Sequence, residues 1–263
     1  MLTSKYIRKI PVTYSCDETK KFLDDLEDWF YLFEFSNGTR TEIDTLLNTI
    51  HQTRADLIFP FLDFVFEDKW GICSCIDIAC NQGWFATQIA LRGGEVIGFD
   101  LRDEHIEKAN LIKKMGQLTN VNYHQKNLFD IDTNSTGERE TFDIVLLLGI
   151  LYHLDNPMGA IKKARELTNK VCVIETQVTK EMNAPQILWG SDESVRYGTG
   201  VGVFFSDTYH AEGGNQIVIV PTLAALYQML YAAGFNYLHL VVPSQKCYVQ
   251  YPDFDRVVIF AFT

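Results

Sequence analysis

Two acidic residues occur beside apolar runs, at positions where a carboxylate could bind a ligand. Asp77 lies inside the run Ile72–Ala79, and Asp100 follows the run Val96–Phe99. A carboxylate placed about twenty residues after the first run can accept hydrogen bonds from both hydroxyls of a ribose. The pair therefore predicts a site for a cofactor that carries a nucleoside. The alternative is structural, with Asp77 capping a turn and Asp100 capping a helix predicted to begin at Asp103, itself a plausible N-cap.

The turn after the first run contains mostly small residues. It reads Ala79-Cys80-Asn81-Gln82-Gly83. Asn81 can adopt the left-handed backbone conformation that glycine adopts more often, so a tight turn is feasible. A cofactor can approach the backbone closely there, because no bulky side chain blocks it. A dinucleotide is disfavoured, since the glycine-rich pyrophosphate turn is missing and the Asn81 side chain would crowd a pyrophosphate.

A third group of candidates follows the apolar run Phe142–Leu148. The sequence continues Gly149-Ile150-Leu151-Tyr152-His153, and His153 is a candidate general base because its unperturbed pKa lies near neutrality. His210, in a later polar segment, is a second candidate base. The alternative for His153 is that it only orients the loop.

These candidates all follow apolar runs that alternate with helical patterns. The predicted strands are Ile72–Ala79, Val96–Phe99, Val121–His124, Phe142–Leu148, Val171–Glu175, Tyr237–Val242 and Val257–Phe262, the last two antiparallel to each other. The predicted helices run from Gly83 to Leu91, Asp103 to Met115, Pro157 to Leu167 and Thr222 to Ala233. This alternation predicts an α/β fold, a doubly wound Rossmann-like domain with a seven-stranded, mostly parallel sheet. Ligands of such a sheet bind at the carboxyl ends of the strands.

Two segments fall outside this alternation. Residues 1–69 are predicted to be an amino-terminal helical lid region, with amphipathic helices over Asp17–Phe35 and Thr41–Phe66. The cofactor-binding domain is predicted to span residues 70–263, with a cap insertion at 177–220. Both segments are rich in aromatic residues and would close a pocket suited to a small molecule.

The composition narrows the class of partner. The chain has 263 residues, with 23 basic and 34 acidic side chains and a formal net charge of −11. Nucleic acid is therefore an improbable partner, although a local basic patch stays open. No leader-like segment and no apolar run of membrane-spanning length is present in the sequence, which predicts a cytoplasmic protein with no membrane association. The oligomeric state is not predicted.

The turn that contains Asp77 resembles the first motif of class I S-adenosylmethionine-dependent methyltransferases. Asp77 and Gly83 match the motif, whereas Ala79 and Asn81 replace its first two glycines. The resemblance implies S-adenosylmethionine as the cofactor, with Asn127 at the adenine amine and Gly149 and Tyr152 beside the reacting centre. The implied cofactor contacts are Asp77, Ala79, Asn81, Gly83, Phe85, Asp100, Leu101, Asn127, Leu128, Leu148, Gly149 and Tyr152.

Within this superfamily, the chain is most similar to the transferases that carboxymethylate the wobble uridine of transfer RNA. The similarity runs from about Trp70 to the end and includes Ile150–His153, Val173–Thr176, Val220–Leu226 and Arg256–Ile259. In those enzymes a tyrosine and an arginine, at the places of Tyr152 and Arg256, help hold the extra carboxylate of carboxy-S-adenosylmethionine. A lysine that contributes there has no convincing match in this chain. Arg256 could instead form a structural ion pair.

The predicted reaction is the transfer of a methyl group to an oxygen or nitrogen of a small-molecule acceptor. His153, Tyr152 and His210 are the catalytic candidates. Two alternatives stay open: a wobble-uridine (carboxy)methyltransferase, and a catalytically silent protein that binds S-adenosylmethionine. The carboxylate-rich set Glu175, Asp207, His210 and Glu212 could bind a divalent cation or could be solvated loop residues, and no metal is predicted.

Overall fold

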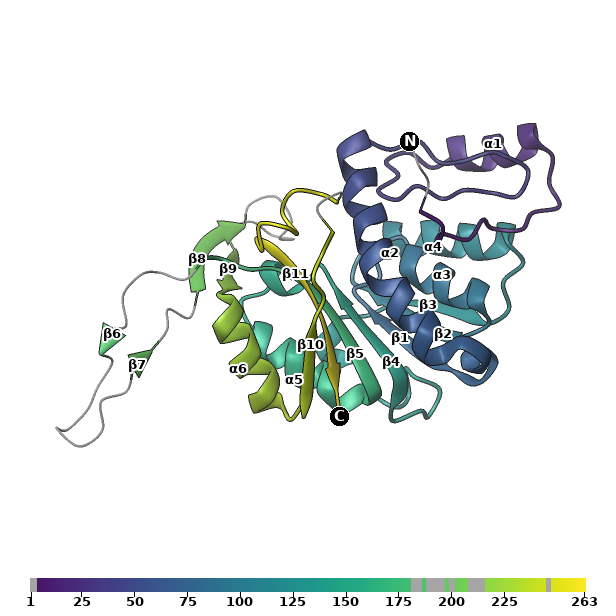
Figure 1. The fold of residues 1–263 in the computed structure, drawn as a ribbon. Helices are drawn as coiled ribbons and strands as arrows, with labels where there is room; N and C mark the ends of the chain where they lie inside the picture. The colour runs from purple at the N-terminus through teal and green to yellow at the C-terminus, as the bar shows by residue number, and fades with distance from the viewer. Residues whose placement is uncertain (1–3, 181–185, 188–196, 199–201, 208–215, 245–246) are drawn as a thin grey trace.

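The structure is a computed structural model of the chain. It describes residues 4–180, 186–187, 197–198, 202–207, 216–244 and 247–263. A seven-stranded sheet forms its centre in the order β10-β11-β5-β4-β1-β2-β3, with helices on both faces (Figure 1). The strands are β1 (Ser74–Ile78), β2 (Glu95–Asp100), β3 (Val121–Gln125), β4 (Phe142–Leu148), β5 (Thr168–Gln177), β10 (Tyr237–Leu240) and β11 (Arg256–Phe262). The predicted Rossmann-like fold is confirmed.

The direction of the strands also agrees with the prediction. Strands β1 to β5 pair in parallel, whereas β11 is antiparallel to both β5 and β10. The carboxyl ends of β4, β1 and β2 are therefore neighbours at one edge of the sheet. Candidate residues that follow these three strands are brought together by this pairing alone.

The two faces of the sheet pack against different helices. One face contacts α2 (Thr45–Phe66), α3 (Trp84–Arg92) and α4 (Asp103–Met115), and the other contacts α5 (Pro157–Leu167) and α6 (Leu223–Ala233). Side chains alternate between these layers along β4, with Ile144 and Leu146 on the α2 side and Val145 and Leu147 on the α5 side. The inner strands β4 and β11 are mostly apolar on both faces because helices cover both faces, whereas the edge strands β3 and β10 have exposed positions.

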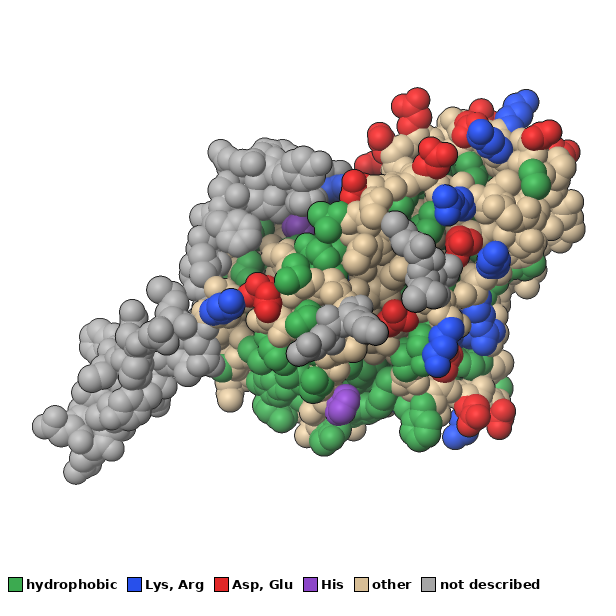
Figure 2. All heavy atoms as spheres, turned by 45° about the horizontal axis from the view of Figure 1, so that its top comes forward, with side chains coloured by type: hydrophobic (Ala, Val, Ile, Leu, Met, Phe, Trp, Pro, Cys, Tyr) green, Lys and Arg blue, Asp and Glu red, His purple; other side chains and the backbone are tan. Residues whose placement is uncertain are grey.

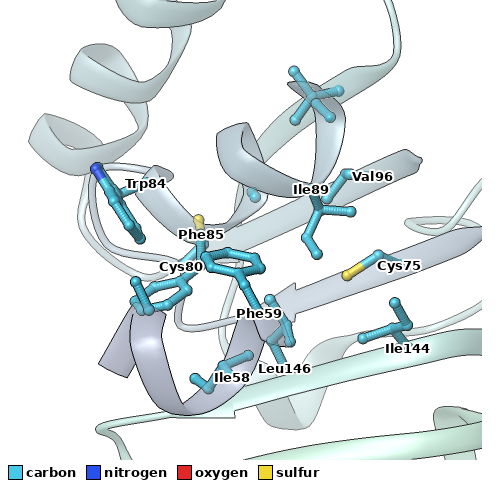
Figure 3. Close-up of a cluster of buried hydrophobic side chains, with 14 of the residues drawn as sticks. Ile58, Phe59, Cys75, Cys80, Trp84, Phe85, Ile89, Val96, Ile144 and Leu146 are labelled. Atoms are coloured by element: carbon cyan, nitrogen blue, oxygen red, sulfur yellow. The ribbon is translucent and has the colours of Figure 1, made fainter. Parts of the chain in front are cut away.

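The core between the sheet and the helices of the α2 side is rich in aromatic rings. Figure 3 shows Phe59 of α2 near Trp84 and Phe85 of α3, with Ile144 and Leu146 of β4 beneath them. The Phe59 and Phe85 rings are stacked, with their centroids 6.0 Å apart. This contact fixes α2 over the amino-terminal end of α3 and so brings the amino-terminal region against the turn after β1.

The predicted helix over Asp17–Phe35 is wrong in its second half. The helix α1 spans only Cys16–Asp24, and Asp28 then adopts a left-handed conformation with φ 59°. The chain continues to Phe35 as an extended segment, bridged to Ile10. Its aromatic residues follow a three-to-four spacing because they pack on α2 and α3, so the spacing reflects burial rather than helix formation.

The other helices agree more closely with the sequence. The second predicted helix, Thr41–Phe66, begins four residues later as α2 because Asp44 is its N-cap and accepts hydrogen bonds from the backbone of Leu46 and Leu47. Helix α4 has the predicted bounds, but its N-cap is Arg102 and not Asp103, which is the first helical residue. Short 3-10 turns complete the helices, namely η1 (Glu67–Ile72), η2 (Leu128–Asp130) and η3 (Leu151–His153).

The segment predicted to be a cap contributes two small antiparallel pairs outside the main sheet. These are β6 (Gln186–Ile187) with β7 (Tyr197–Gly198), and β8 (Gly202–Asp207) with β9 (Gln216–Pro221). His210 and Glu212 lie outside the described residues. Whether this segment acts as a cap therefore stays a prediction.

The surface of the amino-terminal region has charged side chains of both signs (Figure 2). Figure 2 shows basic side chains standing among acidic ones over the amino-terminal region, at the upper right of that view. Of the helices in the described ranges, none is long and apolar enough to cross a membrane.

Candidate active site

The turn after β1 has an unusual backbone. Ala79, Asn81 and Gly83 all adopt left-handed conformations, with φ values of 59°, 51° and 73°. The conformation proposed for Asn81 from the sequence is therefore present, and Ala79 adopts it as well. For a residue with a side chain this costs about 1–2 kcal/mol, so the rest of the turn must hold the conformation in place.

Asp100 holds this turn from the neighbouring strand. Its Oδ2 accepts a hydrogen bond from the backbone nitrogen of Asn81 at 2.8 Å, and its Oδ1 accepts one from that of Arg102 at 3.0 Å. The Nδ1 atom of His105 lies 3.1 Å from the same Oδ1. A carboxylate has about four acceptor positions, so these contacts leave capacity for a ribose hydroxyl. Asp100 thus holds the turn after β1 and the residue before α4, rather than capping α4 as the structural alternative expects, and it can still bind a ligand.

Asp77 is buried inside the first motif. Its Oδ2 accepts a hydrogen bond from the backbone nitrogen of Ala86, at the start of α3, at 3.1 Å. Burial raises the pKa of this carboxyl to about 8, although the Ala86 hydrogen bond acts in the opposite direction. Asp77 therefore has a structural contact, but with the first turn of α3 and not with the turn that the structural alternative expects it to cap.

Gly83 is required by two separate constraints. Its φ is left-handed, and a Cβ atom built on it would lie 2.6 Å from the ring of Tyr123. The Tyr123 hydroxyl donates to the Gly83 carbonyl at 3.1 Å. Tyr123 of β3 therefore occupies the space beside the motif glycine and fixes the entry into α3.

The other predicted cofactor residues occupy different environments. Asn127 is the N-cap of η2 and accepts a hydrogen bond from the Phe129 backbone at 3.0 Å, so part of its polar capacity serves the turn. Leu128, directly after Asn127, is buried, whereas Leu101, directly after Asp100 at the end of β2, is exposed. Phe85 differs from the prediction, because its ring lies in the core against Phe59 and Trp84 (Figure 3).

The loop after β4 brings Gly149 and Tyr152 together. Gly149 has φ 71°, and its backbone nitrogen donates to the Glu175 carbonyl at 2.8 Å. A Cβ on Gly149 would lie 3.4 Å from the Tyr152 hydroxyl. His153 is half-buried at the end of η3, with its ring centroid 4.2 Å from that of Tyr152. Leu148, half-buried at the end of β4, completes the predicted set at this strand end.

A buried charged cluster lies directly beside this loop. Its centre is Glu175 of β5, whose side chain is fully buried. The Glu175 carboxylate forms an ion pair with Arg54 of α2 at 2.9 Å and another with Arg256 of β11 at 2.8 Å. The Tyr251 hydroxyl donates to it at 2.9 Å, and Arg256 donates to the Tyr152 hydroxyl at 3.0 Å. We call these five residues the arginine cluster.

The charges in the arginine cluster depend on one another. Burial alone would raise the pKa of Glu175, but Arg54 and Arg256 outweigh burial and hold the pKa below its usual value. Glu175 is therefore ionised, and the structural ion pair considered for Arg256 is present. Glu175 is thus engaged by two arginines, which disfavours the cation site considered for it.

Three polar residues of this region were missed by the sequence reasoning, namely Tyr251 of the arginine cluster and two residues of α2. Arg54 and His51 lie three residues apart on the buried face of α2, otherwise lined by Ala55, Ile58 and Leu62. Their signal was a pair of polar residues on an apolar stripe. That signal was available, but it does not indicate which distant residues they contact.

The chain matches a known family over more than half of its length. A family model described as a methyltransferase domain matches residues 72–220, and the chain belongs to this family. The predicted class, an S-adenosylmethionine-dependent methyltransferase, and the predicted cofactor are confirmed at this level. The resemblance to the transfer-RNA branch stays a prediction.

Individual relatives are more distant. A ubiquinone biosynthesis O-methyltransferase of Acinetobacter baylyi is 26% identical over 108 residues, which cover 40% of this chain and 44% of that protein. One from Vibrio cholerae is 25% identical over 154 residues, covering 57% and 55% of the two chains. The matched part is thus about half the length of these curated relatives.

A solved structure extends the likeness of the fold to nearly the whole chain. The amino-terminal domain of EvdMO1, solved in the presence of S-adenosylhomocysteine and D-fucose, has a TM-score of 0.65 at 18% identity, covering 95% of this chain and 99% of that one. At this identity the likeness establishes the fold alone.

Proposed function

We propose that this enzyme transfers a methyl group from S-adenosylmethionine to an oxygen or nitrogen of a small-molecule acceptor. The observation that carries the proposal is the hydrogen bond from Asn81 to Asp100, which links the turn after β1 to the end of β2. It fixes a backbone turn of small residues beside a carboxylate with remaining acceptor capacity. This combination suits an adenosyl group with its two ribose hydroxyls.

The residues present would bind and orient the donor rather than activate it. Asp100 would accept from the ribose, Asn127 from the adenine amine, and the loop of Gly149 and Tyr152 would border the reacting methyl group. The bound donor supplies an already activated methyl group on a sulfonium. The chain mainly has to align the acceptor and exclude water, which can contribute a large part of the rate enhancement.

Oxygen is favoured over nitrogen as the accepting atom. The curated relatives are named O-methyltransferases, and the structural relative was solved with a sugar present. His153 remains a candidate base for a hydroxyl acceptor. Its half-buried position beside Tyr152 keeps it near the loop of the proposed reacting centre.

Calorimetric titration with S-adenosylhomocysteine tests the cofactor site. We expect wild type to bind, and Asp100→Ala to lose about tenfold to a hundredfold in affinity, because hydrogen bonds to a charged group contribute about 1.5–3 kcal/mol. Asp103→Ala is the matched control, since Asp103 is an exposed acid three residues away. Equal losses in both variants, or no binding by wild type, would refute the proposed site.

A product assay tests the acceptor. Release of S-adenosylhomocysteine is measured with catechol and D-fucose as hydroxyl probes and with aniline as an amine probe. Turnover with a hydroxyl probe alone would support oxygen transfer, whereas turnover with aniline alone would exclude the preference for oxygen. Detectable turnover with any probe would also rule out the catalytically silent alternative.

One observation favours a second candidate, the wobble-uridine carboxymethyltransferase. The pair matched in the resemblance, Tyr152 and Arg256, is in direct contact in the arginine cluster at 3.0 Å. Carboxy-S-adenosylmethionine would bind more tightly than S-adenosylmethionine if this candidate is correct. Failure of the protein to bind transfer RNA at low salt would count against it, because phosphate contacts are strongest there.

A further inference from the structure

The arginine cluster contains more positive than negative charge. Arg54 and Arg256 are 5% and 7% exposed, and Glu175 is the one carboxylate that contacts them among the described residues. The facing phenols add no charge, because burial raises the pKa of Tyr31 and of Tyr251 well above the usual value. Two buried cations thus share one buried anion. A buried charge without a counter-ion is unfavourable, which suggests that a ligand completes the cluster.

The two arginines differ in how fully they are bonded. Arg256 donates to Gln250 at 2.9 Å, to Glu175 at 2.8 Å and to Tyr152 at 3.0 Å, so its three nitrogens are all engaged. Arg54 has the ion pair with Glu175, while its buried Nε has no hydrogen-bond partner among the described residues. Within the cluster, the buried donor without a hydrogen bond therefore lies on Arg54.

Arg54 faces the loop of the proposed reacting centre. Its Nη2 lies 3.1 Å from where a Cβ of Gly149 would be, so the absence of a side chain at Gly149 allows the guanidinium to approach the backbone. His51, one turn earlier on α2, is buried and both of its ring nitrogens lack hydrogen-bond partners in the described part of the chain. Burial, Arg54 and Arg256 all lower the pKa of His51, so it adds a neutral polar group rather than a third cation.

We propose that the acceptor is an acidic hydroxyl, such as a phenol or an enol, that binds as its oxyanion with Arg54 as the counter-ion. This inference rests on the proposed function, because a sulfonium beside Gly149 would bring a second positive charge near Arg54, and an anionic acceptor would offset both charges. The hydroxyl proton passes to water as the acceptor binds. In the transfer, the oxygen–carbon bond forms while the carbon–sulfur bond breaks, and the electron pair of that bond stays on sulfur as a neutral thioether.

A chromogenic phenol tests the proposal without turnover. The protein is first saturated with S-adenosylhomocysteine, 4-nitrophenol is added, and the phenolate absorbance is followed against pH. We expect the apparent pKa of the bound probe to fall by about one unit or more in wild type, because an adjacent cation favours the ionised form. Arg54→Gln should abolish this shift and Arg54→Lys should retain part of it.

Other charged and titratable groups near Arg54 can also shift the apparent pKa of the probe. Their effect must be distinguished from that of Arg54. Tyr31 and His51 belong to the amino-terminal region, Tyr152 to the loop after β4, and Glu175, Tyr251 and Arg256 to the rest of the cluster. Arg92→Gln is the control, because Arg92 is also a buried arginine, paired with Asp63 of α2 at 2.7 Å. The Arg92→Gln variant should keep the full shift in the apparent pKa of bound 4-nitrophenol.

A second comparison uses wild type alone, in case Arg54→Gln does not fold. At a pH where free 4-nitrophenol is ionised, the complex should bind 4-nitrophenol at least tenfold more tightly than its neutral methyl ether, 4-nitroanisole. Equal affinities, no binding of 4-nitrophenol, or an unchanged shift in folded Arg54→Gln would overturn the proposal. If Arg54→Gln instead removes only a preference for carboxy-S-adenosylmethionine, Arg54 serves the donor and the proposal is also wrong. Absence of S-adenosylhomocysteine binding would separately refute the proposed function.

Discussion

The turn after β1 and the arginine cluster both lie at the carboxyl ends of neighbouring strands, but they are built differently. The turn joins residues that are close in sequence, from Asp77 to Asp100, across two adjacent parallel strands. The cluster joins residues from α2, β5 and β11, separated by up to two hundred positions along the chain. One region depends on local backbone geometry, whereas the other depends on the whole fold.

The difference also concerns electrostatics. In the turn, the buried Asp77 carboxyl has no cation beside it within the described part of the chain, and burial raises its pKa to about 8. In the cluster, Glu175 is equally buried, but two guanidinium groups keep its pKa below the usual value. Burial therefore favours a neutral acid at Asp77, whereas two arginines overcome its effect at Glu175.

Removing the carboxylate of the cluster should have the largest effect on stability. Glu175→Gln leaves Arg54 and Arg256 buried without their counter-ion, and breaking a buried pair in this way costs about 3–5 kcal/mol. The free energy of unfolding is measured by urea titration. The control is Glu95→Gln, which breaks an exposed pair with Arg139 and should cost about 0–1 kcal/mol. Similar losses in the two variants would contradict the distinct role given to the cluster.

The sequence predicted the turn well and the cluster poorly, for a physical reason. A strand, a tight turn and a helix are specified by neighbouring residues, so the positions of Asp77, Gly83 and Asp100 relative to the strand ends follow from local pattern. The contact between Arg54 and Glu175 depends on how α2 packs on the sheet, which no local pattern determines. The sequence singled out Tyr152 and Arg256 only through a resemblance, and it left Arg54, which shares Glu175 with Arg256, unrecognised.

The same distinction explains the error in the amino-terminal region. The aromatic spacing from Phe22 to Phe33 fits a helical stripe, yet the chain leaves the helix at Asp25 and continues in extended form. Tyr31 then stacks on Trp84 with an interplanar angle of 14°, and the Trp84 indole nitrogen donates to the Leu32 carbonyl. Tertiary packing therefore overrode a local periodicity.

Within the turn, Gly83→Ala should have the next largest effect. The substitution introduces left-handed backbone strain, and its new Cβ clashes with the Tyr123 ring. Together these two effects should lower the free energy of unfolding by about 2–4 kcal/mol. Gly137→Ala separates the two contributions, because Gly137 has a φ of 65° and nothing within 4 Å of its would-be Cβ. Urea unfolding should therefore give a clearly larger loss at Gly83. Equal losses of stability in the two variants would mean that the Tyr123 ring moves away from the new Cβ without a cost in free energy.

The electrostatic contrast predicts a pH dependence for Asp77. Its folded-state pKa is raised to about 8, so its stabilising contribution is complete below the unfolded value near 4 and is lost as pH rises through 8. Asp77→Asn can still accept the Ala86 hydrogen bond but does not titrate. We expect the variant to gain on the order of 2 kcal/mol relative to wild type between pH 6 and 8, measured by urea unfolding. A constant difference across this range would contradict a neutral buried acid.

The smallest effect is expected where the turn departs from the usual glycine pattern. Ala79 adopts φ 59°, so Ala79→Gly should relieve about 1–2 kcal/mol of strain while adding about 0.5–1 kcal/mol of unfolded-state entropy. The net gain in stability should be about 1 kcal/mol or less, and affinity for S-adenosylhomocysteine should stay within about twofold, because the turn keeps its hydrogen bond to Asp100. A large loss of affinity with unchanged stability would mean that the Ala79 methyl group contacts the ligand. The turn would then depend on side chains for binding, and its contrast with the cluster would be weaker than the backbone geometry indicates.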